Sequence, residues 1–315
     1  MFFGHLYVIV TGAESLTSWH FDQMGVLSFF VHTSLVLMLS MERSPANGRD
    51  WFLSFYLRRS FRIYPLSMVC VTIAMILHRS PAISEPVVYW TWPQYFSNLA
   101  LTTNLLFTPV MVGGLWTLPI EVQMYITLPF LFLAGRKYGL KLLGALWLLA
   151  IPVAFAQLRT TRRLDVLGYV PCFIAGAIAW RLSTMAPRRI PGWLWPFAMV
   201  SVWPVFFAAR HGNDMPFRWA YCLVLGLALP WFQEFSWAPL VRVAHWIAKY
   251  SYGIYLSHIA LMLWCFNLPV PRPAQLAVFV PLAVATPVAM FHFIEDPMIR
   301  FGQRLAKRLF DPARS

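Results

Sequence analysis

The sequence predicts an all-α membrane protein, a polytopic bundle of about ten transmembrane helices of which the first is incomplete at its N-terminus. Hydrophobic residues make up 59% of the 315 residues and charged residues only 12%, whereas a soluble domain carries roughly 25% charged residues. Trp and Phe, which gather at the two surfaces of a bilayer, number 15 and 26. We expect one integral-membrane domain over residues 1–297 and a basic amphipathic cytoplasmic tail over residues 298–315.

Apolar runs close to the 20 residues that a spanning helix needs recur along the chain. They lie at 26–41, 64–78, 115–135, 140–157, 166–182, 193–209, 218–233, 253–269 and 276–294. A shorter run opens the chain at residues 2–10. A helix from Met1 to Gly12 would rise about 18 Å, less than the roughly 30 Å of a bilayer's apolar core. We therefore expect the first span to lack residues upstream of Met1.

The basic residues are distributed asymmetrically between the two sides of this bundle. If the N-terminus lies inside, the inner segments hold 18 of the 25 Lys and Arg residues, as the positive-inside rule requires. The cluster from Arg159 to Arg163 falls on the outer side and disagrees with this orientation. The net charge of +13 thus fits loops that face the anionic lipid of a bilayer. We expect an inner (plasma) membrane protein that does not bind nucleic acid.

Two segments differ from simple spans. Residues 81–114 contain four prolines and interfacial aromatic residues, which predicts an external loop that re-enters the membrane at 99–111. The stretch "MIRFGQRLAKRLF" (298–310) alternates apolar and basic residues at helical spacing, which predicts an amphipathic helix on the inner membrane surface. The four cysteines are far apart in apolar runs, and we interpret them as packing residues without metal or disulfide.

Glu121 is an isolated acid in the run "LWTLPIEVQMYITLPFLFLAG" (115–135). A charge near a bilayer centre costs roughly 2.5–3.5 kcal/mol on insertion scales. Pro119 predicts a helix start near Leu118, which would place Glu121 within the first turn, where the helix dipole stabilises an anion. A capping acid and a site-forming acid therefore both fit. Tyr125 lies four residues further, on the same helix face.

His5 lies in the opening run "FFGHLYVIV" (2–10). A neutral imidazole there can act as a general base near pH 7, although a lone His in such a run is more often a hydrogen-bonded packing residue. The stretch "YSYGIYLSHIALM" (250–262) carries Tyr252, Tyr255 and His258 at spacings of three. This polar stripe fits either a substrate site or hydrogen bonding between helices.

Three arginines, Arg58, Arg59 and Arg62, lie in "FYLRRSFRIYP" (55–65) on the expected inner side. Basic anchors at a membrane interface are common. Guanidinium groups also grip phosphate through paired hydrogen bonds, so a phosphate-binding patch is the second interpretation.

Together these stretches resemble the acyltransferase-3 family of integral-membrane acyltransferases. The resemblance rests on five motifs in the family's order: "GVLSFFVHTSLVL" (25–37), "LRRSFRIYP" (57–65), "LWTLPIEVQMYITLP" (115–129), "SYGIYLSH" (251–258) and "IEDP" (294–297). The stretch "YVPCFIAGAIAW" (169–180) fits a further helix of that family. The resemblance covers nearly the whole chain.

The chain departs from the family pattern at two places. Thr33, Ser34 and Leu35 replace the family's Ser-Gly-Phe. His5 aligns with the His of the family's first helix, but the Arg that the family carries ten residues earlier would precede Met1. His20 is a rival for that role; it lies in a polar stretch, so we assign His5.

The resemblance implies transfer of an acyl group, expected to be acetyl, from acyl-coenzyme A to a hydroxyl of a carbohydrate or other small-molecule acceptor. Acyl-CoA would be a substrate, with no bound cofactor and no metal. On this interpretation His5 is the catalytic base and Glu121 orients it, while Arg58, Arg59 and Arg62 bind the donor's phosphates. The acceptor site would be lined by Trp116, Tyr125, Tyr255 and His258.

Two other functions fit parts of the pattern. A transporter or flippase of an envelope precursor would use Glu121 and the histidines as proton relays, but the two halves of the chain show no repeat. An inactive remnant that serves as a scaffold would account for the absent Arg.

Overall fold

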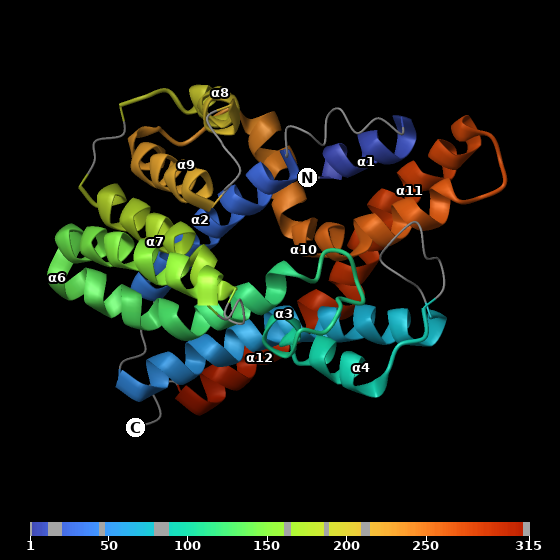
Figure 1. The fold of residues 1–315 in the computed structure, drawn as a ribbon, viewed down its shortest axis with the longest axis horizontal. Coiled ribbons are helices and arrows are strands. Elements are labelled where there is room, and N and C mark those ends of the chain that lie inside the picture. Colours follow the sequence, from blue (N-terminus) through green and yellow to red (C-terminus); the bar gives the residue numbers. More distant parts are fainter. Residues whose placement is uncertain are drawn as a thin grey trace. The chain divides into compact units, whose positions relative to one another are not determined.

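The computed structural model describes residues 2–11, 21–43, 48–78, 88–160, 165–185, 189–208 and 215–310. Within these ranges the chain is helical and forms no strand; its one β-bridge joins Ile190 to Phe232 (Figure 1). The all-α prediction is therefore confirmed. The chain divides into two compact units, one of Ala13–Ser44 with Ile120–Val241, the other of Phe2–Gly12, Pro45–Pro119 and Arg242–Ser315. We call them the first and the second unit.

The first unit is built around one buried helix. Its helices are α2 (Phe21–Glu42), α6 (Thr117–Thr160, from Ile120 on), α7 (Val166–Ser183), α8 (Trp195–Ala208) and α9 (Met215–Ala228), with short 3-10 turns η2 (Gly192–Leu194) and η3 (Leu229–Trp231). Helix α7 packs between α2 and α9 (Figure 1). A Cβ at Gly176 would collide with the Val31 carbonyl oxygen, and a Cβ at Gly226 with that of Ala175. Small residues thus let the backbones approach closely, as in many membrane bundles.

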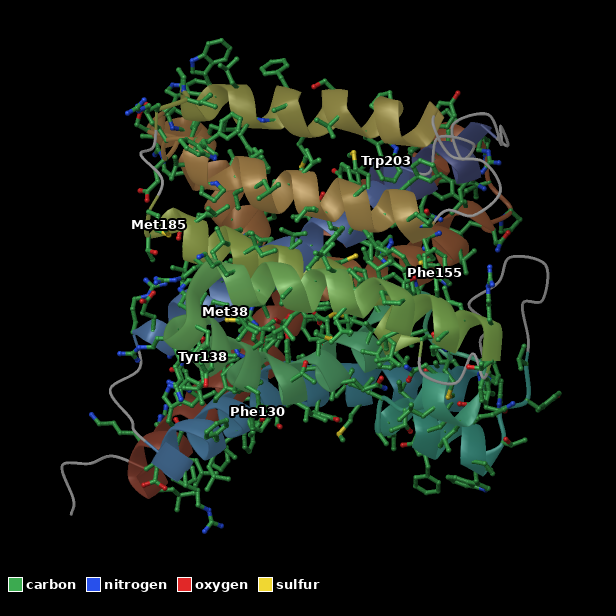
Figure 2. All side chains as sticks on the ribbon, turned by 60° about the vertical axis from the view of Figure 1, so that its left-hand side comes forward. Met38, Phe130, Tyr138, Phe155, Met185 and Trp203 are labelled. Atoms are coloured by element: carbon green, nitrogen blue, oxygen red, sulfur yellow. The ribbon has the colours of Figure 1, made fainter. Side chains whose placement is uncertain are left out.

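Helix α6 consists of two helical segments joined at Gly139, where φ is 75°. Glycine adopts this left-handed conformation at no steric cost. The break falls between the predicted spans 115–135 and 140–157. The side chains of Phe130 and Tyr138 on α6 are each 60% exposed, whereas Met38 of α2 is buried (Figure 2). An apolar surface of this kind is expected where a helix faces lipid.

The second unit holds helices from both ends of the chain. They are α1 (Phe2–Thr11), α3 (Gly48–Leu77), α4 (Trp92–Leu99), α5 (Thr103–Leu106), α10 (Ala238–Phe266, from Arg242 on), α11 (Arg272–Met290), the π-helical turn η4 (Phe291–Glu295) and α12 (Asp296–Phe310). Helices α3 and α12 lie side by side (Figure 1), and Gly302 admits the ring of Phe61 between them. The amphipathic helix predicted for the tail is thus present as α12; residues 311–315 lie outside the described ranges.

Within the described residues five helices are long and apolar enough to cross a membrane: Gln23–Glu42, Gly48–Leu77, Thr117–Thr160, Val166–Ser183 and Arg272–Phe310. A multi-pass membrane protein is therefore supported. Two predicted segments differ in detail. The apolar run 64–78 is only the second half of α3, since that helix begins at Gly48. The predicted loop 81–114 contains the short helices α4 and α5, and its residues 81–87 lie outside the described ranges.

Candidate active site

Two imidazoles face each other in the second unit, where α1 meets α10. The ring centroids of His5 and His258 lie 5.6 Å apart. Phe2, one turn before His5, stacks on Phe279 of α11 at 6.0 Å and lies 6.1 Å from His258. Further along α1, Leu6, Ile9 and Val10 pack against the buried cluster of Met262, Cys265, Phe266 and Phe279. An apolar interface between three helices therefore holds the two imidazoles together.

His258 is anchored through one of its two ring nitrogens. Its Nδ1 lies 2.7 Å from the carbonyl oxygen of Tyr255 and 3.1 Å from that of Ile254. The side chain is only 3% exposed, and its Nε2 is buried without a hydrogen-bond partner among the described residues. Leaving a buried acceptor unsatisfied costs about 1–3 kcal/mol. The family resemblance predicts that His258 lines the acceptor site, but no sequence pattern indicates that its Nε2 lacks a hydrogen-bond partner among the described residues.

Tyr255 is fixed beside His258 by Thr117 and two adjacent glycines, none of which the sequence predicts as site residues. Its hydroxyl lies 2.6 Å from Thr117 Oγ1, and the two rings of Tyr255 and His258 lie 6.2 Å apart. A Cβ at Gly114 would lie 2.8 Å from the Tyr255 carbonyl oxygen, and one at Gly113 would lie 2.8 Å from Ile259. The adjacent glycines of "VGGLW" (112–116) are the sequence signal for this close approach. Trp116, the next predicted acceptor-site residue, is 39% exposed.

The three arginines share helix α3 of the second unit. The Nε of Arg58 donates to the Ser54 carbonyl oxygen at 3.2 Å, Arg59 lies over the ring of Phe55 at 5.9 Å, and Arg62 is exposed. They occupy one region of the helix, as the i, i+1, i+4 spacing predicts.

A tyrosine connects this arginine-bearing turn to α10. The hydroxyl of Tyr252 donates to the Ile63 carbonyl oxygen at 2.7 Å. His258 lies six residues further along α10, a rise of about 9 Å at 1.5 Å per residue. The arginines and the imidazole pair are therefore two levels of one unit, about two helical turns apart.

Glu295 is a buried acid at the end of the π-helical turn η4. Its side chain is 3% exposed. π-Helical turns are frequent at functional sites. In the sequence, "IEDP" (294–297) is one of the family-like motifs, but a helix-ending turn accounts for it equally well.

Glu121 and Tyr125 lie in the first unit, on α6, and their side chains are 3% and 8% exposed. Helix α6 begins at Thr117 and has no acidic residue in its first turn. The prediction that Glu121 lies within that turn is therefore wrong, because the helix starts one residue earlier than Pro119 alone suggests. His5 and Glu121 belong to different units, so their pairing stays a prediction. The rival His20 lies outside the described residues.

Comparison with known proteins identifies relatives across most of the chain. A family model described as an acyltransferase domain, Acyl_transf_3, matches residues 1–292. The peptidoglycan O-acetyltransferase OatA of Listeria monocytogenes is 25% identical over 89% of this chain and 51% of its own length. YrhL, a candidate peptidoglycan O-acetyltransferase of Bacillus subtilis, is 25% identical over 92% and 52%. The acyltransferase MdmB of Streptomyces mycarofaciens is 28% identical over 44% and 35%.

The chain thus spans about half the length of the two peptidoglycan relatives. No solved structure matches it.

Proposed function

The chain belongs to the acyltransferase-3 family of membrane acyltransferases, and from this premise we propose that it transfers an acyl group from acyl-CoA to a hydroxyl of an envelope carbohydrate. The acyl group is expected to be acetyl, because two relatives are named as peptidoglycan O-acetyltransferases. The same names favour a glycan acceptor. We assign the protein to the inner (plasma) membrane, with the donor on the cytoplasmic side.

One observation carries this proposal: the second unit holds both an arginine-bearing helix and an imidazole pair. Arg58, Arg59 and Arg62 supply three guanidinium groups for the phosphates of coenzyme A. His5 stands at the level of His258, about 9 Å further along α10 than Tyr252, which holds α3. The donor can therefore have its phosphates at one level and its thioester at the other, with the pantetheine arm between them bent.

Each of the site residues has a role in the proposed reaction. His5 accepts the proton of the acceptor hydroxyl while the hydroxyl oxygen forms a bond to the acyl carbon. The bond from that carbon to sulfur breaks, and the proton ends on the coenzyme A thiol. The family resemblance also assigns a catalytic role to Glu121, that of an acid which stabilises a protonated imidazole, as in hydrolase triads. Trp116, Tyr255 and His258 line the acceptor site, while the role of Tyr125, which belongs to the first unit, stays a prediction from the sequence.

The test is acyl transfer by the purified protein in proteoliposomes. Radiolabelled acetyl-CoA is supplied at the cytoplasmic face, with soluble peptidoglycan fragments as acceptor. We expect labelled ester on the fragments and release of coenzyme A thiol in equal amount. Mass spectrometry of envelope glycans with and without the gene gives the same answer in cells, as the loss of an acyl group.

Movement of intact glycan across the bilayer without ester formation would instead support the transporter alternative. Neither ester nor thiol release, with folded protein and both substrates present, would contradict the proposal.

A further inference from the structure

His258 has one nitrogen whose role the fold leaves open. Its Nδ1 is in contact with two backbone carbonyl oxygens, those of Tyr255 and Ile254. A carbonyl oxygen only accepts hydrogen bonds, so Nδ1 must carry the hydrogen of the neutral ring. The lone pair is then on Nε2, which is buried and has no hydrogen-bond partner in the described part of the chain.

A packing role does not account for this arrangement. Buried polar atoms in native proteins nearly always have a partner, and the exceptions call for an explanation such as catalysis. The hydroxyl of the neighbouring Tyr255 does not donate to Nε2, because it pairs with Thr117 Oγ1 at 2.6 Å. The other rings around His258 are the phenyl ring of Phe2 at 6.1 Å, which has no donor, and the imidazole of His5 at 5.6 Å.

We propose that His258 Nε2 is a second proton acceptor, which receives the proton that His5 removes from the acceptor hydroxyl. The proposal rests on the acyl transfer proposed above. An imidazole nitrogen can accept a proton and give it up again, so two neighbouring imidazoles can exchange one proton. Two positive charges at this separation repel each other, so the pair holds one extra proton at a time.

The reaction balances with this relay. The hydroxyl oxygen bonds to the acyl carbon, and its proton goes to His5 and then to Nε2 of His258. The carbon–sulfur bond breaks with its electron pair on sulfur. The sulfur takes the proton from His258, which returns the pair to its neutral state. His258 thus keeps His5 available as a base during the transfer.

The test compares His258→Asn with wild type in proteoliposomes that contain acetyl-CoA and soluble peptidoglycan fragments. The Asn amide N–H can replace Nδ1–H at the backbone carbonyls, but Asn offers no base at the Nε2 position. We expect kcat to fall about 10²–10⁴-fold, the usual contribution of a proton-transferring group, with KM for acetyl-CoA unchanged. The pH dependence of kcat should change shape. His245→Asn, at an exposed position on the same helix, is the control and should behave as wild type.

A double variant separates a relay from a structural role. Residues that act as a unit are strongly non-additive, so His5→Asn with His258→Asn should be no slower than His5→Asn alone. Multiplied losses in the double variant would overturn the relay, as would a wild-type kcat and pH profile in His258→Asn. If His258→Asn is not recovered folded, His258→Gln takes its place with the same expected and contradicting results. An inactive wild type contradicts the proposed function, whereas an active wild type beside an unaffected His258 variant contradicts only the relay.

Discussion

Helices α7 and α10 are both largely apolar, yet their buried polar groups differ in kind. Around α7 three donors have long-range acceptors: Trp219 Nε1 donates to Gly168 O at 2.6 Å, Ser34 Oγ to Phe173 O at 2.7 Å and Trp180 Nε1 to Glu42 Oε2 at 2.9 Å. The buried atom of α7 without a partner in the described part of the chain, Arg181 Nε, can only donate a hydrogen bond. On α10, the stripe of Tyr252, Tyr255 and His258 ends in a nitrogen with no partner among the described residues. Satisfied polar groups hold a bundle together, whereas an unpaired basic nitrogen is available for proton transfer.

The comparison predicts that substitutions around α10 reduce activity with little effect on stability, and that substitutions around α7 do the reverse. The first and largest effect is expected for His5→Asn. Loss of the base should lower kcat for acetyl transfer about 10²–10⁴-fold, with an unchanged midpoint of thermal unfolding in detergent. Transfer of labelled acetyl groups measures the first quantity and the unfolding curve the second.

Glu121→Gln tests the predicted partner in the same assay. It should lower kcat less than His5→Asn, because an orienting acid acts only through the base. Wild-type transfer by both variants would contradict the catalytic assignment of His5 and Glu121.

The membrane spans and the polar stripe of α10 could be predicted from the sequence, but the approach of His5 to His258 and the tautomer of His258 could not. Hydropathy locates the spans because a bilayer demands about 20 apolar residues in each, and helical spacing places Tyr255 and His258 on one stripe. The approach of His5 to His258 depends on the packing of Phe2 against Phe279, residues that are distant in sequence and show no local pattern. The tautomer of His258 depends on a contact with its own helix backbone, and no sequence pattern reports that contact.

The second expected effect concerns the arginines of α3. Replacing Arg58, Arg59 and Arg62 together by Gln should raise KM for acetyl-CoA about tenfold or more for each arginine that contacts phosphate, since a hydrogen bond to a charged group contributes about 1.5–3 kcal/mol. kcat should change much less. Initial rates over a range of acetyl-CoA concentrations measure both constants.

Arg304→Gln, an exposed arginine on α12, is the charge-matched control and should keep the wild-type KM. If the triple variant also keeps it, the arginines are membrane anchors and not a donor site.

The third effect concerns the close packing of α7 on α2. Gly176→Ala introduces a Cβ that meets the Val31 backbone carbonyl and lies 2.6 Å from Ser34 Cβ, and overpacking of this kind typically costs about 1–3 kcal/mol. Thermal unfolding should shift to lower temperature, while kcat per folded molecule stays at the wild-type value. Gly144→Ala is the matched control, because nothing lies within 4 Å of its Cβ. Equal unfolding midpoints for the two alanine variants would refute the close packing of α7 on α2.

The smallest effects are expected for two hydrogen bonds of nearly equal length, one from each region. Ser34→Ala removes the bond to Phe173 O, and Thr117→Val removes the bond to Tyr255. Each should lower the free energy of unfolding by about 0.5–1.5 kcal/mol, the usual net worth of such a bond. Only Thr117→Val should also lower kcat severalfold, because it frees the tyrosine beside His258. Equal kcat values for the two variants would show that Tyr255 stabilises the bundle without positioning the imidazole, and the chemical role of α10 would then be confined to His258.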